Sequence, residues 1–217
     1  SGLFKLIDPA GATLDENSQI NFGDWKGRGA DALAAGSLAR GANGRMEARF
    51  RLYDTQKQAA LGGAVYVTGN DQLRAAGHRI ADYIYEKLTG EKGVFSTRIA
   101  YVVKSGAQFR LQIADADGQG AATALTSNEP IISPVWSPDG SAMAFVMNGA
   151  LHVVEVDETG KPTGEPRQLA EGLADSPTWS GDSSTILFLR DGELKTVDVK
   201  GGSVSDVALD LQWTAQE

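Results

Sequence analysis

The chain has 217 residues, 41% of them hydrophobic, so it is long enough for one large or two modest domains that each bury a core. Its net charge of −8 argues against a nucleic-acid surface, which needs clustered Lys and Arg. Without cysteine it can form neither disulfides nor thiolate metal sites, and it contains no apolar run long enough for membrane insertion.

The first 93 residues are predicted to form a small α+β domain. Residues 21–25 and then 28–38, rich in Ala, indicate a short helix that runs into a strand. Apolar and polar residues alternate over 46–53 and again over 62–68. This alternation predicts an antiparallel hairpin with a loop at 54–59.

A helix is predicted over residues 71–88, where the apolar residues recur with a helical period. Asp71 is expected to be its N-cap, because a short acidic side chain can accept hydrogen bonds from the first helical amides. Gly90 is expected to end the helix, since glycine readily adopts the left-handed conformation at that position.

The remaining residues, 94–217, are predicted to be short strands in about three repeated units. The first unit holds strands at 97–104, 108–114 and 122–125; the second at 133–137, 142–147, 151–156 and about 167–169; the third at 176–180, 185–190, 193–199 and 204–209. A last strand at 211–214 resembles the opening strand of another unit.

The second and third units repeat one motif. Trp136 and Trp179 lie 43 positions apart, as do Asp139 and Asp182, and an apolar run follows each motif. A period of this size is typical of a four-stranded propeller blade. We interpret the Trp residues as fillers of the wedge between blades, and Asp139 with Gly140 as a hairpin turn.

The strand count predicts an open propeller. The first unit lacks its opening strand, and the tail supplies one strand too many. Because known propellers use about four to eight blades, three blades do not close a ring. We therefore expect half of a six-bladed propeller, joined to the α+β domain.

Signs of catalysis are few. His78 and His152 fall in different domains, and neither has the spacing that places two ligands on one metal. The chain contains no Gly-x-Ser-x-Gly motif of a serine hydrolase. We expect no enzyme activity, no cofactor and no metal site.

Several segments resemble the TolB family, the periplasmic propeller proteins of the Tol-Pal system. The resemblance is most specific over residues 78–103, continues through 127–140, and includes 1–4 and 50–54. It covers roughly residues 1–147.

The resemblance implies a small α+β domain followed by six blades, a periplasmic location, no enzyme activity, and binding to the lipoprotein Pal and other Tol components. Members of the family begin with a signal peptide, an arm that reaches TolA, and an opening strand and helix. None of these precedes Ser1, and the first six residues do not have the pattern of a signal peptide. The resemblance thus implies a domain truncated at its start and three blades fewer than expected.

The later part has a different character. Residues 155–169, 174–183 and 209–213 are more similar to propeller segments of TolB-like periplasmic amidohydrolases. An engineered propeller chimera, a natural recombinant, or a chain with residues missing would each give this pattern. If the amidohydrolase resemblance holds, the metal-binding barrel lies outside this chain.

Two kinds of protein binding are predicted. In the first, a Pal-like partner docks on the connections at 127–133 and 170–176, where the candidate contact residues are Asn128, Glu129, Glu171 and Asp175. In the second, the strand with Leu209, Leu211 and Trp213 completes the first unit of another copy. Two copies would then close a six-bladed homodimer, which leaves no strand edge unpaired.

Overall fold

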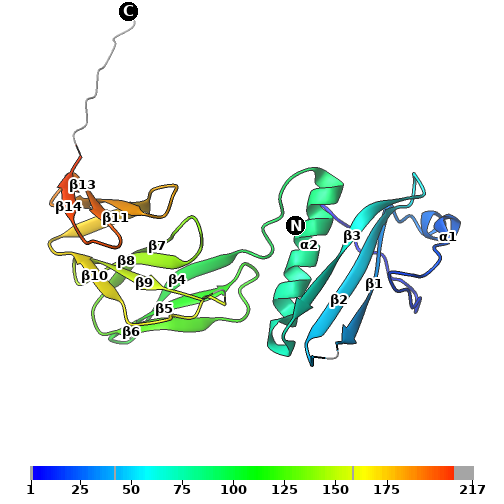
Figure 1. Cartoon of the computed structure of the whole chain (residues 1–217), viewed down its shortest axis with the longest axis horizontal. Coiled ribbons are helices and arrows are strands. Elements are labelled where there is room, and N and C mark those ends of the chain that lie inside the picture. Colours follow the sequence, from blue (N-terminus) through cyan, green and yellow to red (C-terminus); the bar gives the residue numbers. More distant parts are fainter. Residues whose placement is uncertain (1, 42, 158, 208–217) are drawn as a thin grey trace, which may run out of the picture. The chain divides into compact units, whose positions relative to one another are not determined.

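A computed structural model describes residues 2–41, 43–157 and 159–207 (Figure 1). The chain divides into two compact units, Ser1–Ser96 and Thr97–Glu217. The first contains helices and a sheet, and the regular elements of the second, over its described residues, are strands. The expected order of an α+β part followed by propeller blades is confirmed.

The first unit is a three-stranded antiparallel sheet with a helix on one face (Figure 1). Its elements are α1 (Phe22–Gly27), β1 (Ala32–Arg40), β2 (Met46–Asp54), β3 (Ala59–Thr68), the 3-10 helix η1 (Asn70–Gln72) and α2 (Leu73–Thr89).

The alternation in β2 positions α2. Phe50 and Leu52 are buried, whereas Arg51 between them is exposed. The ring of Phe50 meets the ring of Tyr83 on α2 edge to face, with centroids 5.3 Å apart. The apolar face of the predicted hairpin therefore packs against α2.

The predicted short helix that runs into a strand is present, but the helix is confined to the first part of the predicted segment. It is α1, and it ends where Gly29 adopts a φ of 78°. The Ala-rich stretch forms β1, which pairs with β2 over its whole length. Tertiary pairing thus overrides the helix propensity of alanine.

The predicted end of α2 is correct, but its predicted N-cap is not. Asp71 lies in η1 and Gln72 is the N-cap, without a side-chain capping bond, so the predicted Asp71 cap is wrong. Gly90 does end the helix, with φ 81° and its N–H donating to the Glu86 oxygen at 2.8 Å.

The second unit consists of three propeller blades. Its first sheet is β4 (Arg98–Ser105), β5 (Gln108–Asp115) and β6 (Ala122–Ser127); its second is β7 (Ile131–Trp136), β8 (Ala142–Met147), β9 (Ala150–Glu155) and β10 (Arg167–Ala170); its third is β11 (Ala174–Trp179), β12 (Thr185–Arg190), β13 (Glu193–Asp198) and β14 (Val204–Asp206). Among the described residues the first blade has three strands, whereas the other two have four each.

The core lies between the blades. On β8, Ala144 and Val146 pack toward the third blade, while Met143 and Phe145 pack toward the first. All four are almost completely buried. Because β8 is covered on both faces, its sequence is an unbroken apolar run rather than an alternation.

Candidate protein-binding site

The two predicted docking connections lie at one end of the second unit, which we call the connection end. It comprises residues 128–130 between β6 and β7, residues 171–173 between β10 and β11, and the hairpin turns at 148–149 and 191–192. Antiparallel strands alternate in direction, so blade-to-blade connections and these turns share an end. The Ala174 N–H donates to the Gly149 oxygen at 2.7 Å, which joins a connection to a turn directly.

Backbone hydrogen bonds repeat at this end. The Asn148 N–H donates to the Pro130 oxygen at 3.4 Å, and the Asp191 N–H donates to the Leu173 oxygen at 3.3 Å. Each bond ties a connection to the hairpin turn of the blade that it enters. Asn148 and Asp191 have φ values of 50° and 54°, and a positive-φ glycine follows each, as two-residue hairpin turns require.

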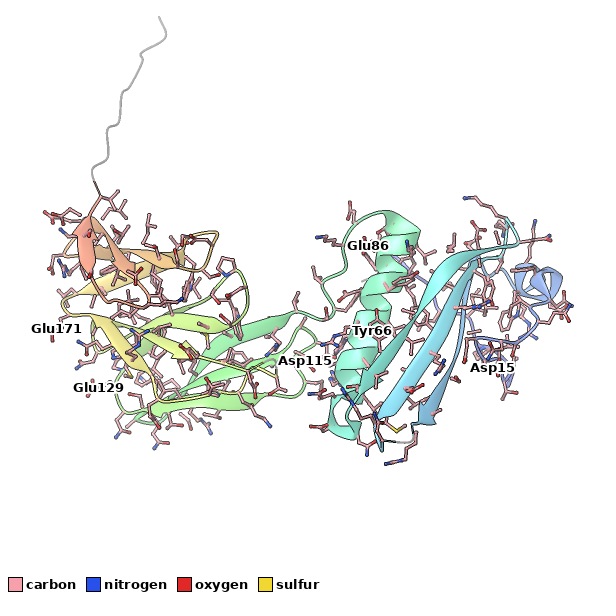
Figure 2. All side chains as sticks on the ribbon, viewed as in Figure 1. Asp15, Tyr66, Glu86, Asp115, Glu129 and Glu171 are labelled. Carbon is pink, nitrogen blue, oxygen red and sulfur yellow. The ribbon has the colours of Figure 1, made fainter. Side chains whose placement is uncertain are left out.

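Three of the four predicted contact residues lie on the connections. Asn128, Glu129 and Glu171 are exposed there, and Figure 2 labels the two glutamates. Asp175 is also exposed, but it lies in β11 and accepts a hydrogen bond from the Ser176 N–H at 2.6 Å. The connection end thus offers acidic groups to solvent.

The strands β7 and β11 begin two residues earlier than the sequence indicated. Each has an irregularity in its pairing after its second residue, where Ser133 and Ser176 have φ values of 51° and 50°. Pairing is present on both sides of this bulge. The predicted loops at 127–133 and 170–176 are therefore shorter in the structure, because a bulge bends the strand without ending it.

Sequence reasoning missed the apolar residues at this end. Leu173 is 72% exposed on the β10–β11 connection, and Ile132 is 48% exposed near the start of β7. Exposed apolar side chains beside acidic ones are typical of a surface that binds protein. The signal in the sequence was Leu173 itself, an apolar residue that directly follows a glycine in a predicted loop.

The repeated aspartates lie at the opposite end and close turns. The Asp139 carboxylate accepts hydrogen bonds from the Ser137 hydroxyl at 2.6 Å and from the N–H and hydroxyl of Ser141. The same bonds recur around Asp182. They lower the pKa of both carboxyls to about 2, with the serine hydroxyls as the largest cause. Gly140, with φ 73°, completes the first of these turns.

The repeated tryptophans lie between blades. The Trp179 indole Nε1–H donates to the Val135 oxygen of the preceding blade at 3.1 Å. Trp136 packs on the cluster between the first two blades, where the Arg98 guanidinium lies 5.9 Å from its ring centroid. Both rings occupy wedges between blades, in keeping with a structural role.

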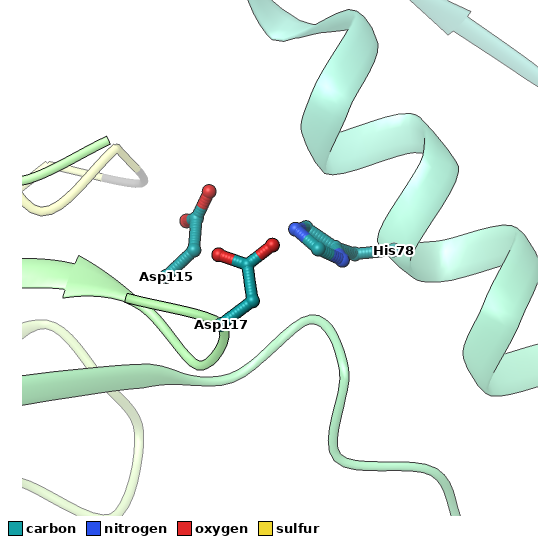
Figure 3. A group of neighbouring side chains, drawn as sticks. All are labelled: His78, Asp115 and Asp117. Atoms are coloured by element: carbon teal, nitrogen blue, oxygen red, sulfur yellow. The ribbon is translucent and has the colours of Figure 1, made fainter. Parts of the chain in front are cut away.

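The histidines lie apart in the sequence and in different units. His152 is buried on β9, stacks on Phe145 with centroids 5.7 Å apart, and has Nδ1 3.0 Å from the Ala150 oxygen. His78 lies on α2 of the first unit; Figure 3 shows it together with Asp115 and Asp117 of the second unit, where the chain turns after β5. That turn is closed by the Gly118 N–H, which donates to the Asp115 oxygen at 2.8 Å.

Comparisons with known proteins give one consistent family. The model described as TolB beta propeller domain matches residues 85–193, and the model described as TolB amino-terminal domain matches residues 1–61. The chain is 75% identical over 146 residues to the Tol-Pal system protein TolB of Dechloromonas aromatica, and 56% identical over 146 residues to that of Bordetella avium. Both matches cover 67% of this chain.

A solved structure agrees. The crystal structure of TolB from Acinetobacter baumannii is similar with a TM-score of 0.77 and 30% identity, over 94% of this chain and 53% of that one. The chain spans about a third of the length of the curated relatives, with 34% and 33% of the two proteins named above covered. Within the described ranges, no helix combines the length and apolar character of a membrane span.

Proposed function

The chain belongs to the TolB family of β-propeller proteins, and on this premise we propose that it is a non-enzymatic protein-binding module of the periplasmic Tol-Pal system. The observation that carries this proposal is the 75% identity over 146 residues to a Tol-Pal system protein TolB. The aspartates with the most strongly lowered pKa values close turns, so their low pKa values have a structural cause and do not point to catalysis.

The partner that we propose is a Pal-like lipoprotein, docked at the connection end. Backbone hydrogen bonds hold this end in one conformation, so little ordering is needed when a partner binds. Leu173 supplies apolar area, while Glu129 and Glu171 supply charges that orient the partner. Asn128 and Asp175 are the further contact residues of this proposal.

The test is calorimetric titration of the chain with the soluble part of Pal. Reversing two charges, Glu129→Lys with Glu171→Lys, is expected to weaken binding about tenfold or more. The new lysines would repel the positively charged groups of the partner that the glutamates attract. The matched control is Glu165→Lys, an exposed glutamate on the β9–β10 connection at the opposite end. Unchanged affinity in the double variant would remove the connection end as the docking face; no binding by the unaltered chain would remove Pal.

A second function that we propose is self-association. The observation that favours it is the first blade, which has three strands among the described residues whereas the other two have four. An inner strand position without a strand leaves backbone donors and acceptors of β4 open to pairing. The expected result is a chain that behaves in solution as a dimer. The predicted last strand at 211–214 and the assembly residues Leu209, Leu211 and Trp213 lie outside the described residues.

A further inference from the structure

The sheet of the first unit is only partly covered on the face away from α2, which we call the outer face (Figure 1). Tyr53 of β2 lies on this face, and the ring of Phe22 on α1 meets it edge to face, with centroids 5.9 Å apart. On β1, the Ser37 hydroxyl donates to the Glu16 carboxylate at 2.6 Å, and Ala35 is buried. The outer face is thus covered along β1 and at the Tyr53 end of β2.

The outer face is open over β3. Val65 and Val67 of this strand pair with outer-face residues of β2, and they are 52% and 44% exposed. Because β3 stands at the end of the strand order β1-β2-β3, its second edge is unpaired among the described residues. An apolar strip and a row of backbone donors and acceptors therefore lie side by side on β3.

The strand β3 lacks the features that usually protect an exposed edge. Natural edge strands are very short, or carry a charged residue or a proline, and these features prevent pairing with another chain. In contrast, β3 has ten residues and contains neither a charged residue nor a proline. Its pairing with β2 is irregular beside Leu61 but regular from Gly62 to Thr68. This regular part favours the addition of a strand from another molecule.

Two arginines bring positive charge to this part of β3. The turn before β2 holds Arg45, which donates from Nη2 to the Val67 oxygen at 3.3 Å. The side chain of Arg51 on β2 lies beside Gly63, where a Cβ would be 3.1 Å from the Arg51 Cγ. Glycine at this position leaves room for the arginine to lie toward the edge strand. A guanidinium has five N–H groups, so both arginines can bind a further acceptor.

The spacing of these charges defines a pattern. The ion pair of Arg49 with Glu47 leaves Arg45 and Arg51 as the outer-face arginines without an ionic partner among the described residues. They lie beside positions of β3 that are four residues apart, about 13 Å along an extended strand. Val65 is midway between these positions. The edge therefore presents a positive, an apolar and a positive group at alternate residues.

We propose that β3 accepts an extended segment of a protein partner as a further strand, and that this segment has the pattern acidic-x-apolar-x-acidic. Alternate residues of the added strand lie on the outer face, so its apolar residue packs beside Val65 and its carboxylates reach Arg45 and Arg51. The pattern is the same in both directions and fits parallel or antiparallel addition. This inference concerns the first unit and does not rest on docking at the connection end.

The first experiment is an NMR titration of the isotope-labelled full chain with the peptide Thr-Glu-Thr-Val-Thr-Glu-Thr, blocked at both ends. We expect the amide signals of residues 62–68 to shift, and a peptide with lysine in place of both glutamates to leave them unchanged. No shift with the glutamate peptide, or equal shifts with both, would overturn the proposal. If only vesicles of phosphatidylglycerol shift these signals, the surface binds anionic lipid and the proposal is wrong.

Charge reversal tests the two arginines. The double variant Arg45→Glu with Arg51→Glu should bind the glutamate peptide about tenfold or more weakly and should bind the lysine peptide instead. The matched control is Arg40→Glu, an exposed arginine of β1 on the face toward α2, which should keep the original preference. Circular dichroism checks that all chains are folded. A double variant that still prefers the glutamate peptide would overturn the role of the arginines.

Methylated peptides test the addition of a strand as such. Alternate N–H groups of a strand face the same side, so either the glutamates or the threonines next to valine direct their N–H groups toward β3. One peptide is methylated on the two glutamate nitrogens, and the other on the nitrogens of those two threonines. We expect one of them to lose binding and the other to keep it. Equal behaviour of the two would show that the segment does not pair with β3.

Discussion

The backbone N–H of Asp139 donates to the Oγ of Ser183 at 3.2 Å, and this bond joins the turn of the second blade to the equivalent turn of the third. Ser183 has a φ of 62°, at the position where the other turn has Gly140. The aspartate turns are therefore connected to each other across a blade boundary. Their carboxylates make stability depend on pH.

Acid should lower the thermal stability of the blades over a defined range of pH. Asp139 and Asp182 have folded pKa values of about 2, below the usual 3.8. A lowered pKa stabilises the fold above the unfolded value, and this contribution is lost as pH falls through the folded value. We expect the melting temperature of the unaltered chain to fall between about pH 4 and pH 2.

The variants Asp139→Asn and Asp182→Asn, combined, test this cause. They should lower the melting temperature at pH 7, because an amide oxygen is a weaker acceptor than a carboxylate for the serine hydroxyls. They should also flatten its decline between pH 4 and pH 2. Glu171→Gln, which removes a charge from an exposed connection, is the control. A double variant with an unaltered slope would show that other carboxyls cause the acid sensitivity.

Equivalent aromatic residues in two blades should contribute differently to the free energy of unfolding. Phe145 is fully buried between the first two blades, whereas Tyr101, its equivalent in the first blade, is half-buried. Phe145→Ala is expected to lower the free energy of unfolding by about 3–5 kcal/mol, through lost burial and a cavity. Tyr101→Ala should cost less than half as much.

Urea denaturation followed by circular dichroism measures both losses. The comparison is made at a protein concentration low enough for the chain to be monomeric, since a partner that covers the first blade would bury Tyr101 as well. Equal losses at that concentration would contradict the view that the first blade has an open face.

The blades were predictable because their pattern is local. Trp136 and Asp139 recur after 43 residues, and the apolar runs that follow mark strands covered on both faces. The three strands that the first blade has among the described residues match the three expected from the same pattern. The Ala-rich β1 was not predictable from its own residues, since its pairing with β2 decides its conformation.

The candidate site was only partly predictable, because much of it depends on contacts between repeats. The connections themselves were visible as polar loops that hold Glu129 and Glu171. In the sequence, Ile132 looks like a buried strand residue. Only the structure shows that regular pairing is interrupted directly after it, at the bulge that contains Ser133. The bond from Trp179 to Val135 crosses a blade boundary, so no local pattern indicates it.

Two glycines of the first unit should respond to alanine with opposite signs. Gly62 on β3 has a φ of 135°, and a Cβ there would lie 2.2 Å from the Tyr83 Oη. Gly77 is exposed on α2, and a Cβ there meets nothing within 4 Å. Gly62→Ala should therefore lower the free energy of unfolding by about 1–3 kcal/mol, and Gly77→Ala should raise it by about 0.5–1 kcal/mol.

A double variant separates the two causes at Gly62. Adding Tyr83→Phe removes the hydroxyl that the new Cβ would strike but leaves the backbone strain. We expect Gly62→Ala with Tyr83→Phe to recover part of the loss, relative to Tyr83→Phe alone, in thermal or urea unfolding. Full recovery would mean that the backbone accepts alanine at this φ; no recovery would mean that strain, rather than the contact with Tyr83, requires glycine here.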